Sequence, residues 1–270
     1  MRIALVDSLA ARAAALAMGT VLLLGVTGTA DAQNSAVRAA YKVPRTPDGL
    51  PDLQGIWQVR DTTAAFDVQD HAGALGIPPG RSIVVQPADG KIPYKPEALA
   101  KRQENFKNRD AADTLNKCYM PGVPRITYID FPFQIFETPK YTLITYEYIH
   151  NYRTIFTNGT GHLDGLDWWN GDSRGHWDGD SLVVDVTDFN DQTWFDASGD
   201  FHSDKLHVVE RYTRTGPDTL QYEASIEDPE VYTGPWKISI PLYRHTEPNF
   251  RVLEYECQAY ADEAAKGGGR

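Results

Sequence analysis

The sequence predicts a mainly β protein, an antiparallel up-and-down barrel with one short helix and long irregular loops. Short segments with alternating apolar and polar residues follow one another through the second half of the chain, and tight-turn signals such as Asp178-Gly179-Asp180 separate several of them. The 6 Trp, 14 Tyr and 10 Phe residues favour strands. One helix is expected, in the stretch that begins at Pro96 and is rich in strong helix formers.

The first 32 residues have the features of a secretion signal. Arg2 and Arg12 give a positive start, an apolar run covers residues 13–26, and Ala30-Asp31-Ala32 is a small-x-small cleavage site. The alternative is an uncleaved membrane anchor, but the apolar run is shorter than the roughly 20 residues that span a bilayer. We therefore expect a periplasmic or secreted protein, with no membrane insertion after signal cleavage.

The mature chain is expected to hold one folded domain with extended ends. Residues 33–52 contain three prolines and little periodicity, which indicates an extended lead-in. Residues 53–262 are expected to form a single β-barrel domain. The tail at residues 263–270 ends in a run of glycines and is expected to be disordered.

Within this domain, Gly55-Ile56-Trp57 opens the first strand. Residues 63–94 are expected to be irregular, and a helix is expected over residues 96–104, with proline in its first turn. The other strands are expected at residues 134–137, 141–148, 152–157, 181–186, 206–213, 220–226, 236–243 and 250–257.

Alternation assigns one buried face to the last four of these strands. Leu206, Val208, Glu210 and Tyr212 share a face, because side chains two residues apart point to the same side of a strand. The same period continues through the strands at 220–226, 236–243 and 250–257. We expect this face to line the barrel interior.

Charge and cysteine content narrow the possible partners. The net charge of −11 argues against a nucleic acid and against an anionic membrane surface, so a small-molecule substrate or ligand is the expected partner. Cys118 and Cys257 are the two cysteines. In an oxidising compartment an even pair indicates a disulfide, and the alternative is two buried thiols.

Glu210 is the first candidate for chemistry, because it falls on the apolar face of its strand. Burial raises the pKa of a carboxyl group, which suits general acid–base catalysis. The alternative is a structural ion pair with an interior arginine such as Arg153 or Arg244. The sequence favours neither alternative over the other.

Histidines form the second group of candidates. His202, His207 and Glu210 have the spacing H-x4-H-x2-E, which would suggest a metal site on a helix. The valine-rich context predicts a strand instead, where His207 and Glu210 point to opposite faces, so no metal site is expected. His202 precedes the strand, where it could meet a ligand at the barrel rim or remain a solvated loop residue.

A glycine-rich segment at residues 159–180 is the third candidate. His162, Asp172 and three tryptophans give it polar titratable groups beside aromatic faces, which is typical of a small-molecule or sugar site. It could instead be a connection that covers one barrel end with tryptophans in the core. Calcium binding is a third alternative, although the ligand spacing of an EF-hand is absent from the sequence.

Several sequence motifs of known chemistry are absent. The sequence has no P-loop, no G-x-G-x-x-G after a strand, no G-x-S-x-G elbow and no H-E-x-x-H. The two cysteines fit neither a nucleophile signature nor zinc spacing. The sequence therefore gives no reason to expect a cofactor.

Two resemblances follow from particular residues. Gly55-Ile56-Trp57 before an antiparallel meander resembles the G-x-W opening of lipocalin-like (calycin) barrels, in which the tryptophan plugs the closed end. The chain more closely resembles a family of uncharacterised secreted bacterial proteins, which implies a fold but no activity. The stretches that carry this second resemblance are residues 45–49, 51–57, Cys118 with 121–125, 171–173, 177–185, 202–203 and 206–211. One departure is Thr157-Asn158-Gly159-Thr160, where that family tends to Asp-Gly-Arg, so no role for a basic residue there is implied.

Together these observations predict a small-molecule enzyme of the bacterial envelope that uses acid–base residues at the barrel mouth, as a lyase, isomerase or hydrolase. The main alternative is a lipocalin-like carrier of an apolar or aromatic ligand, and a third is a structural envelope protein. The expected catalytic residues are Glu210, His202, His162 and Asp172. The expected substrate-binding residues are Trp168, Trp169, Trp177, Tyr212, Arg153 and His207.

The predicted export can be tested directly. Mass spectrometry of the protein isolated from its native envelope should find Gln33, or a close neighbour, as the first residue. Recovery of the intact chain with Met1 from the cytoplasm would contradict export.

Overall fold

The structure is a computed structural model that describes residues 41–265 except Leu75 and Asp164. The expected signal peptide, the first part of the lead-in and residues 266–270 lie outside the described residues. The folded unit begins at Tyr41. Residues 263–265, which were expected in the tail, form the end of a helix.

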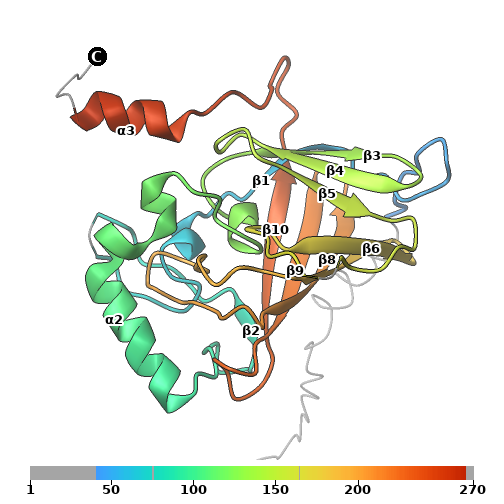
Figure 1. The fold of residues 1–270 in the computed structure, drawn as a ribbon. Coiled ribbons are helices and arrows are strands. Elements are labelled where there is room, and N and C mark those ends of the chain that lie inside the picture. Colours follow the sequence, from blue (N-terminus) through green and yellow to red (C-terminus); the bar gives the residue numbers. More distant parts are fainter. Residues whose placement is uncertain (1–40, 75, 164, 266–270) are drawn as a thin grey trace, which may run out of the picture. The chain divides into compact units, whose positions relative to one another are not determined.

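Nine of the ten strands in the sheet close into a barrel, because the first strand pairs with both the second and the last strand of the circle. Figure 1 shows these strands curving around a common interior. Strand β2 pairs with β10 outside this circle. The strands are β1 (Gly55–Gln58), β2 (Val84–Gln86), β3 (Phe133–Glu137), β4 (Tyr141–Tyr146), β5 (Tyr152–Phe156), β6 (Asp172–Asp178), β7 (Ser181–Thr187), β8 (His207–Gly216), β9 (Thr219–Glu227) and β10 (Trp236–Arg244).

The pairing confirms the predicted mainly β, antiparallel barrel with one exception. The barrel closes where Trp57 of β1 stands opposite Arg244 of β10. Neighbouring strands around the circle are antiparallel except β5 and β6, which run parallel and share the single residue pair Phe156–Arg174. The barrel wall is therefore weakest in backbone hydrogen bonds between β5 and β6.

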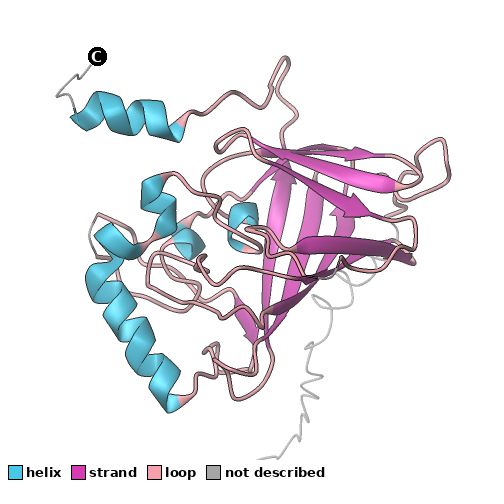
Figure 2. Cartoon of the chain, viewed as in Figure 1, coloured by secondary structure: helices cyan, strands magenta, loops and turns pink. Residues whose placement is uncertain are grey.

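Among the described residues, two α-helices and three short 3-10 helices accompany the strands, and Figure 2 shows them outside the barrel. The predicted helix begins at Pro96 as expected and continues further, so that α2 spans Pro96–Ala112. No helix within the described part of the chain has the length and apolar character needed to cross a membrane. The other helices are α3 (Cys257–Ala265), η1 (Thr63–Ala65), η2 (Thr114–Lys117) and η3 (Arg125–Thr127).

The alternation predicted for the last strands is confirmed in β8, β9 and β10, whose buried and partly exposed residues alternate along their length. The inward side chains pack into one core with those of β1 and β3–β7. Trp57 is fully buried and donates its Nε1 hydrogen to the Leu53 carbonyl at 2.9 Å. The core is therefore filled by large side chains of the barrel wall.

The strand predicted at residues 250–257 is wrong. After β10 the chain forms an irregular segment that touches the barrel at the isolated bridge Tyr148–Tyr255, and Cys257 begins helix α3. Leu253 and Phe250 are exposed. Because β1 and β2 already pair with β10, the barrel has no free edge there for a further strand.

The sequence also failed to indicate β6, which lies within the segment expected to be an irregular loop. Its partner β7 follows through the tight turn that Asp178-Gly179-Asp180 predicted. Gly175 disrupts the strand pattern in the sequence, yet β5 packs so closely here that an added Cβ would lie 2.7 Å from a methyl carbon of Ile155. Glycine at this position permits the close approach.

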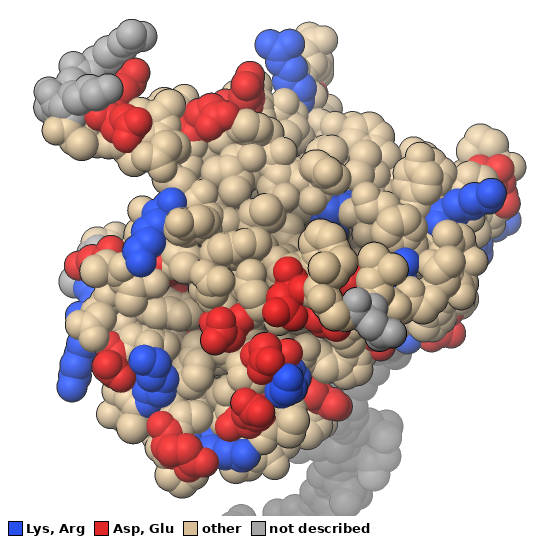
Figure 3. All heavy atoms as spheres, in the orientation of Figure 1, with Lys and Arg blue, Asp and Glu red and all other residues tan. Residues whose placement is uncertain are grey.

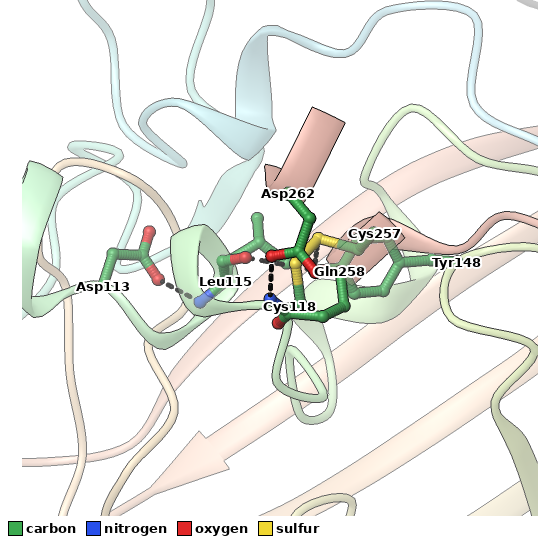
Figure 4. Close-up of a disulfide and its surroundings, with 7 residues drawn as sticks. All are labelled: Asp113, Leu115, Cys118, Tyr148, Cys257, Gln258 and Asp262. Carbon is green, nitrogen blue, oxygen red and sulfur yellow. Dashed lines mark hydrogen bonds between the residues drawn. A yellow bond between two sulfur atoms is a disulfide. The ribbon is translucent and has the colours of Figure 1, made fainter. Parts of the chain in front are cut away.

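The predicted disulfide between Cys118 and Cys257 is present. Figure 4 shows how the Cys118 side is held: Asp113 accepts a hydrogen bond from the Leu115 amide at 3.0 Å, and the Tyr148 hydroxyl donates to the Leu115 carbonyl at 3.1 Å. The bridge joins residues 139 positions apart and fixes the start of α3, which has no buried residue.

Loss of this disulfide should lower stability. The double substitution Cys118→Ser and Cys257→Ser should reduce the free energy of unfolding by about 2–5 kcal/mol, because the unfolded chain regains the freedom of a long loop. Thermal melts check this, with reduced wild type as a control that should melt at the same temperature as the variant. Equal melting temperatures for the variant and the oxidised wild type would contradict it.

Candidate functional site

A buried ion pair spans the barrel interior. Arg153 on β5 donates through Nη2 to Glu210 on β8, and both side chains are at most 2% exposed. Glu210 also accepts hydrogen bonds from the hydroxyls of Tyr212 at 3.0 Å and Tyr222 at 2.8 Å. Arg153 Nε donates to Ser173 Oγ on β6 at 2.8 Å. The structural alternative that the sequence offered for Glu210 is therefore realised with Arg153 rather than with Arg244.

Burial and the ion pair together set the protonation of this group. Burial alone would lower the pKa of Arg153, but the nearby Glu210 carboxylate raises it overall. Burial, reinforced by the charge of Glu210, raises the pKa of Tyr212 and of Tyr222 well above the usual value. The guanidinium thus stays charged and the two phenols stay neutral donors.

Arg153 also lines a pocket of about 460 Å³ at the junction of β5 and β6, which we call the β5–β6 pocket. Its walls come from most of β5, the start of β6, the connection between them and one residue near the disulfide. Apolar and aromatic surface predominates, with polar groups at a few points. The lining residues are Met120, Asn151, Tyr152, Arg153, Thr154, Phe156, Leu163, Asp167, Trp168, Trp169, Asn170, Gly171, Asp172 and Ser173.

The parallel arrangement of β5 and β6 explains where this pocket lies. Parallel neighbours need a crossover rather than a tight turn, and residues 157–171 form that connection. Its end is fixed by backbone hydrogen bonds from Trp168 to the Asp188 carbonyl at 2.8 Å and from Asn190 to the Trp168 carbonyl at 3.0 Å. The Trp169 ring stacks on Tyr119 at 5.0 Å between centroids. The crossover therefore places two tryptophans beside the poorly paired strands.

Three buried side chains in the lining keep a polar atom without a hydrogen-bond partner among the described residues. These atoms are Nη1 of Arg153, Nδ2 of Asn151 and Oδ1 of Asn170. The three residues are only 3–9% exposed. Buried polar atoms are nearly always paired, so three such atoms on one pocket are unusual. Three of the residues that line the pocket therefore each contain an unsatisfied buried polar atom.

Polar residues expected at the site form a chain of contacts at the edge of this pocket. His162 contacts Asp172 through Nδ1 at 3.1 Å and Asp185 through Nε2 at 2.9 Å, and His207 Nε2 lies 3.0 Å from the same Asp185. Arg174 donates twice to Asp172, at 2.8 and 3.0 Å. These contacts fasten the crossover to strands β6 and β7.

Two groups of described side chains have ligand atoms close enough for a cation. His162, Asp172 and Asp188 form one, but Arg174 already neutralises Asp172. The second group consists of buried aspartates that accept hydrogen bonds from Arg102 and from backbone amides. Its members are Asp67, Asp196 and Asp200. Arg102 pairs with Asp67 and Asp200, while burial and the neighbouring aspartates raise the pKa of Asp67 and of Asp196.

The structure brings together some of the expected site residues and separates others. Four of them line the β5–β6 pocket, and His162 bonds to one of these four. Two other expected residues lie in the barrel interior: Glu210 pairs with Arg153, and Tyr212 donates a hydrogen bond to Glu210. The four lining residues are Arg153, Trp168, Trp169 and Asp172.

His202 was expected at the barrel rim, but it is buried. Its ring contacts Thr193 Oγ1 at 2.7 Å and the Ser203 carbonyl at 2.8 Å, and it packs between Phe189 and Phe195. Burial lowers its pKa, so the neutral ring is favoured. Trp177 and His207 are likewise absent from the pocket lining.

The sequence did not indicate Asn151 or Asn170 as site residues. Each stands beside a residue that was expected at the site, Arg153 or Trp169, but asparagine is common in turns and gives no signal by itself. Met120 was also missed, because a single methionine two residues after Cys118 gives no signal of a site. Only the folded chain shows that these residues share a pocket.

Comparison with known proteins gives little further information. No family profile and no curated protein matches the sequence. Among solved structures, a mutant of the fluorescent protein UnaG is similar, with 10% sequence identity and a TM-score of 0.29 over 54% of this chain and 90% of that chain. A likeness this weak carries no argument about function.

The ion pair in the interior predicts a large stability effect. Glu210→Gln should lower the free energy of unfolding by about 3–5 kcal/mol, because Arg153 is left as an unpaired buried cation. Glu223→Gln is the matched control, since Glu223 pairs with Lys237 on the outer face of the adjacent strand and should cost at most about 1 kcal/mol. Urea denaturation measures both, and equal stability of the two variants would contradict the assignment.

Proposed function

We propose that this protein binds a small organic molecule with an aromatic or apolar body in the β5–β6 pocket, as a carrier rather than as a catalyst. One observation carries the proposal. Asn151, Arg153 and Asn170 line one pocket, and each keeps a buried polar atom without a partner among the described residues.

Such atoms are costly in a folded protein without a ligand. A buried donor or acceptor without a partner costs about 1–3 kcal/mol. Proteins retain costs of this kind mainly at sites where function requires them. This cost falls on three residues that line one pocket, which supports a functional site here.

The apolar lining supports an aromatic or apolar body for the ligand. Trp168 is 42% exposed, and Trp169 is held against Tyr119 with the ring planes 5° from parallel. A volume of about 460 Å³ is within the range of small-molecule pockets. A flat apolar group can pack against these rings.

An acid–base enzyme is the second candidate, because Asp172 lines the pocket and contacts His162. Burial would raise the pKa of Asp172, but the hydrogen bonds from Arg174 and from the Leu163 amide lower it. A general acid or base works best with a pKa near the operating pH. This carboxylate is better suited to holding the crossover than to exchanging protons, so we favour the carrier.

We place this binding outside the cytoplasm. The N-terminal sequence predicts export, and the Cys118–Cys257 disulfide fits an oxidising compartment.

Binding can be measured with N-phenyl-1-naphthylamine, an uncharged fluorophore whose emission rises in apolar surroundings. We expect saturable binding to the wild type. Trp169→Ala should weaken the affinity by roughly tenfold, because one wall of the pocket loses its aromatic ring. Trp177→Ala is the matched control, since Trp177 lies on β6 outside the lining.

Melting temperatures of both variants should be recorded with the titrations, so that a loss of fold is distinguished from a loss of binding. A signal that does not saturate, or an equal loss of affinity in the two variants, would contradict a site in this pocket.

A further inference from the structure

Strand β5 has two edges, and only one of them is fully paired. The Asn151 carbonyl accepts a hydrogen bond and the Thr157 amide donates one, both on the β4 side, at the two ends of β5. The main-chain groups of successive residues alternate between the two edges of a strand. Those of Tyr152, Thr154 and Phe156 therefore point at β6.

Of these three residues, only Phe156 has a partner on β6, in the pair with Arg174. The main chains of Tyr152 and Thr154 have no ladder partner on this edge among the described residues, and no loop backbone of that part of the chain bonds to them. Each of the two residues presents one N–H and one C=O. The β5–β6 pocket is lined by β5 and by the start of β6, so it lies along this open edge.

The open edge also lacks the features that protect exposed strands from pairing. Charged side chains and prolines usually prevent a further strand from adding to an edge. The residues that share the outer face of β5 are Tyr152, Thr154 and Phe156, none of which is charged or a proline, and Tyr152 is 68% exposed. The edge is therefore open to an added strand.

On the basis of the proposed function, we infer that the ligand is a short extended peptide with an aromatic side chain, which pairs with the β5 edge as an added strand. Tyr152 and Thr154 present donor and acceptor groups about 6.8 Å apart along the strand, which is the repeat of every second residue in an extended chain. An extended peptide matches this repeat with its own main chain. Its aromatic side chain packs against Trp168 and Trp169, which line the same pocket.

Charge narrows the class of peptide. Within the lining, Arg153 and Asp172 are paired, whereas Asp167 makes no salt bridge with any described residue. The net charge of the chain is −11, and Figure 3 shows groups of acidic side chains on the drawn face, separated by uncharged areas. A field of this sign disfavours an acidic ligand. The peptide is therefore neutral or basic.

An N-methyl scan of one peptide tests the strand pairing. The parent is acetyl-Ala-Ser-Phe-Ser-Ala-amide, and isothermal titration calorimetry measures its binding to the mature protein. Methylation at every second residue should weaken binding by about tenfold, because these amides face β5 and lose a hydrogen bond. Methylation at the intervening residues is the matched control and should change the affinity by less than about threefold, because those amides point away.

Two derivatives of the parent peptide test the charge. Glutamate in place of the last alanine should weaken binding by about threefold, and lysine at the same position should not weaken it. Tighter binding of the glutamate peptide than of the lysine peptide would contradict a neutral or basic ligand.

The variant Thr154→Pro tests the edge from the side of the protein. Proline has no N–H, and the N–H of Thr154 points at β6, so the bonds between β4 and β5 are retained. The parent peptide should bind roughly tenfold more weakly, while the thermal melt stays cooperative. Thr154→Val is the matched control, since it keeps the N–H, and its affinity should stay within about threefold of the wild type. The peptide scan uses the wild-type protein, so it decides even if the proline variant folds poorly.

The outcomes separate this inference from the proposed function. If N-phenyl-1-naphthylamine binds but the peptide does not, or if methylation has no alternating effect, the peptide inference is overturned while the pocket remains a binding site. A wild-type dimer in sedimentation velocity that Thr154→Pro dissociates would assign the edge to a second copy of the chain and would likewise overturn it. If neither probe binds, the proposed function fails as well.

Discussion

The buried pair of Arg153 and Glu210 is the interaction on which the rest of the barrel depends. β5 and β6 share one residue pair, so backbone hydrogen bonds contribute little to closing the wall between them. Arg153 instead links β5 to β8 through Glu210 and to β6 through Ser173. Tyr212 and Tyr222 satisfy the other oxygen of Glu210, so the carboxylate is fully hydrogen-bonded although it is completely buried. Side-chain bonds across the interior thus hold together a wall that the backbone holds weakly.

The β5–β6 pocket follows from the same irregularity. A parallel step in an antiparallel barrel requires a crossover, and the crossover at residues 157–171 brings Trp168 and Trp169 to the place where the strands diverge. His162 attaches this crossover to β6 through Asp172 and to β7 through Asp185, and Arg174 donates to the same Asp172. Residue types that suggest acid–base chemistry in the sequence here have a structural use.

The disulfide also restrains one wall of the pocket. Cys118 is followed by Tyr119, which stacks on Trp169, and by Met120, which lines the pocket. The bridge to Cys257 fixes the turn that carries these two residues and also anchors α3. A single covalent bond therefore restrains both this wall of the pocket and helix α3.

The sequence by itself determined the mainly β class, most strands to within a few residues, the inward faces of β8–β10 and the disulfide, because alternation and cysteine pairing are patterns that short segments and composition reveal. It failed at β6 and at residues 250–257, where barrel closure rather than local preference decides which segment pairs. Tertiary structure alone selected Arg153 as the partner of Glu210 and brought Asn151 and Asn170 to one pocket. These contacts join residues far apart in the chain, and they arise from strand order and register, which no local pattern encodes.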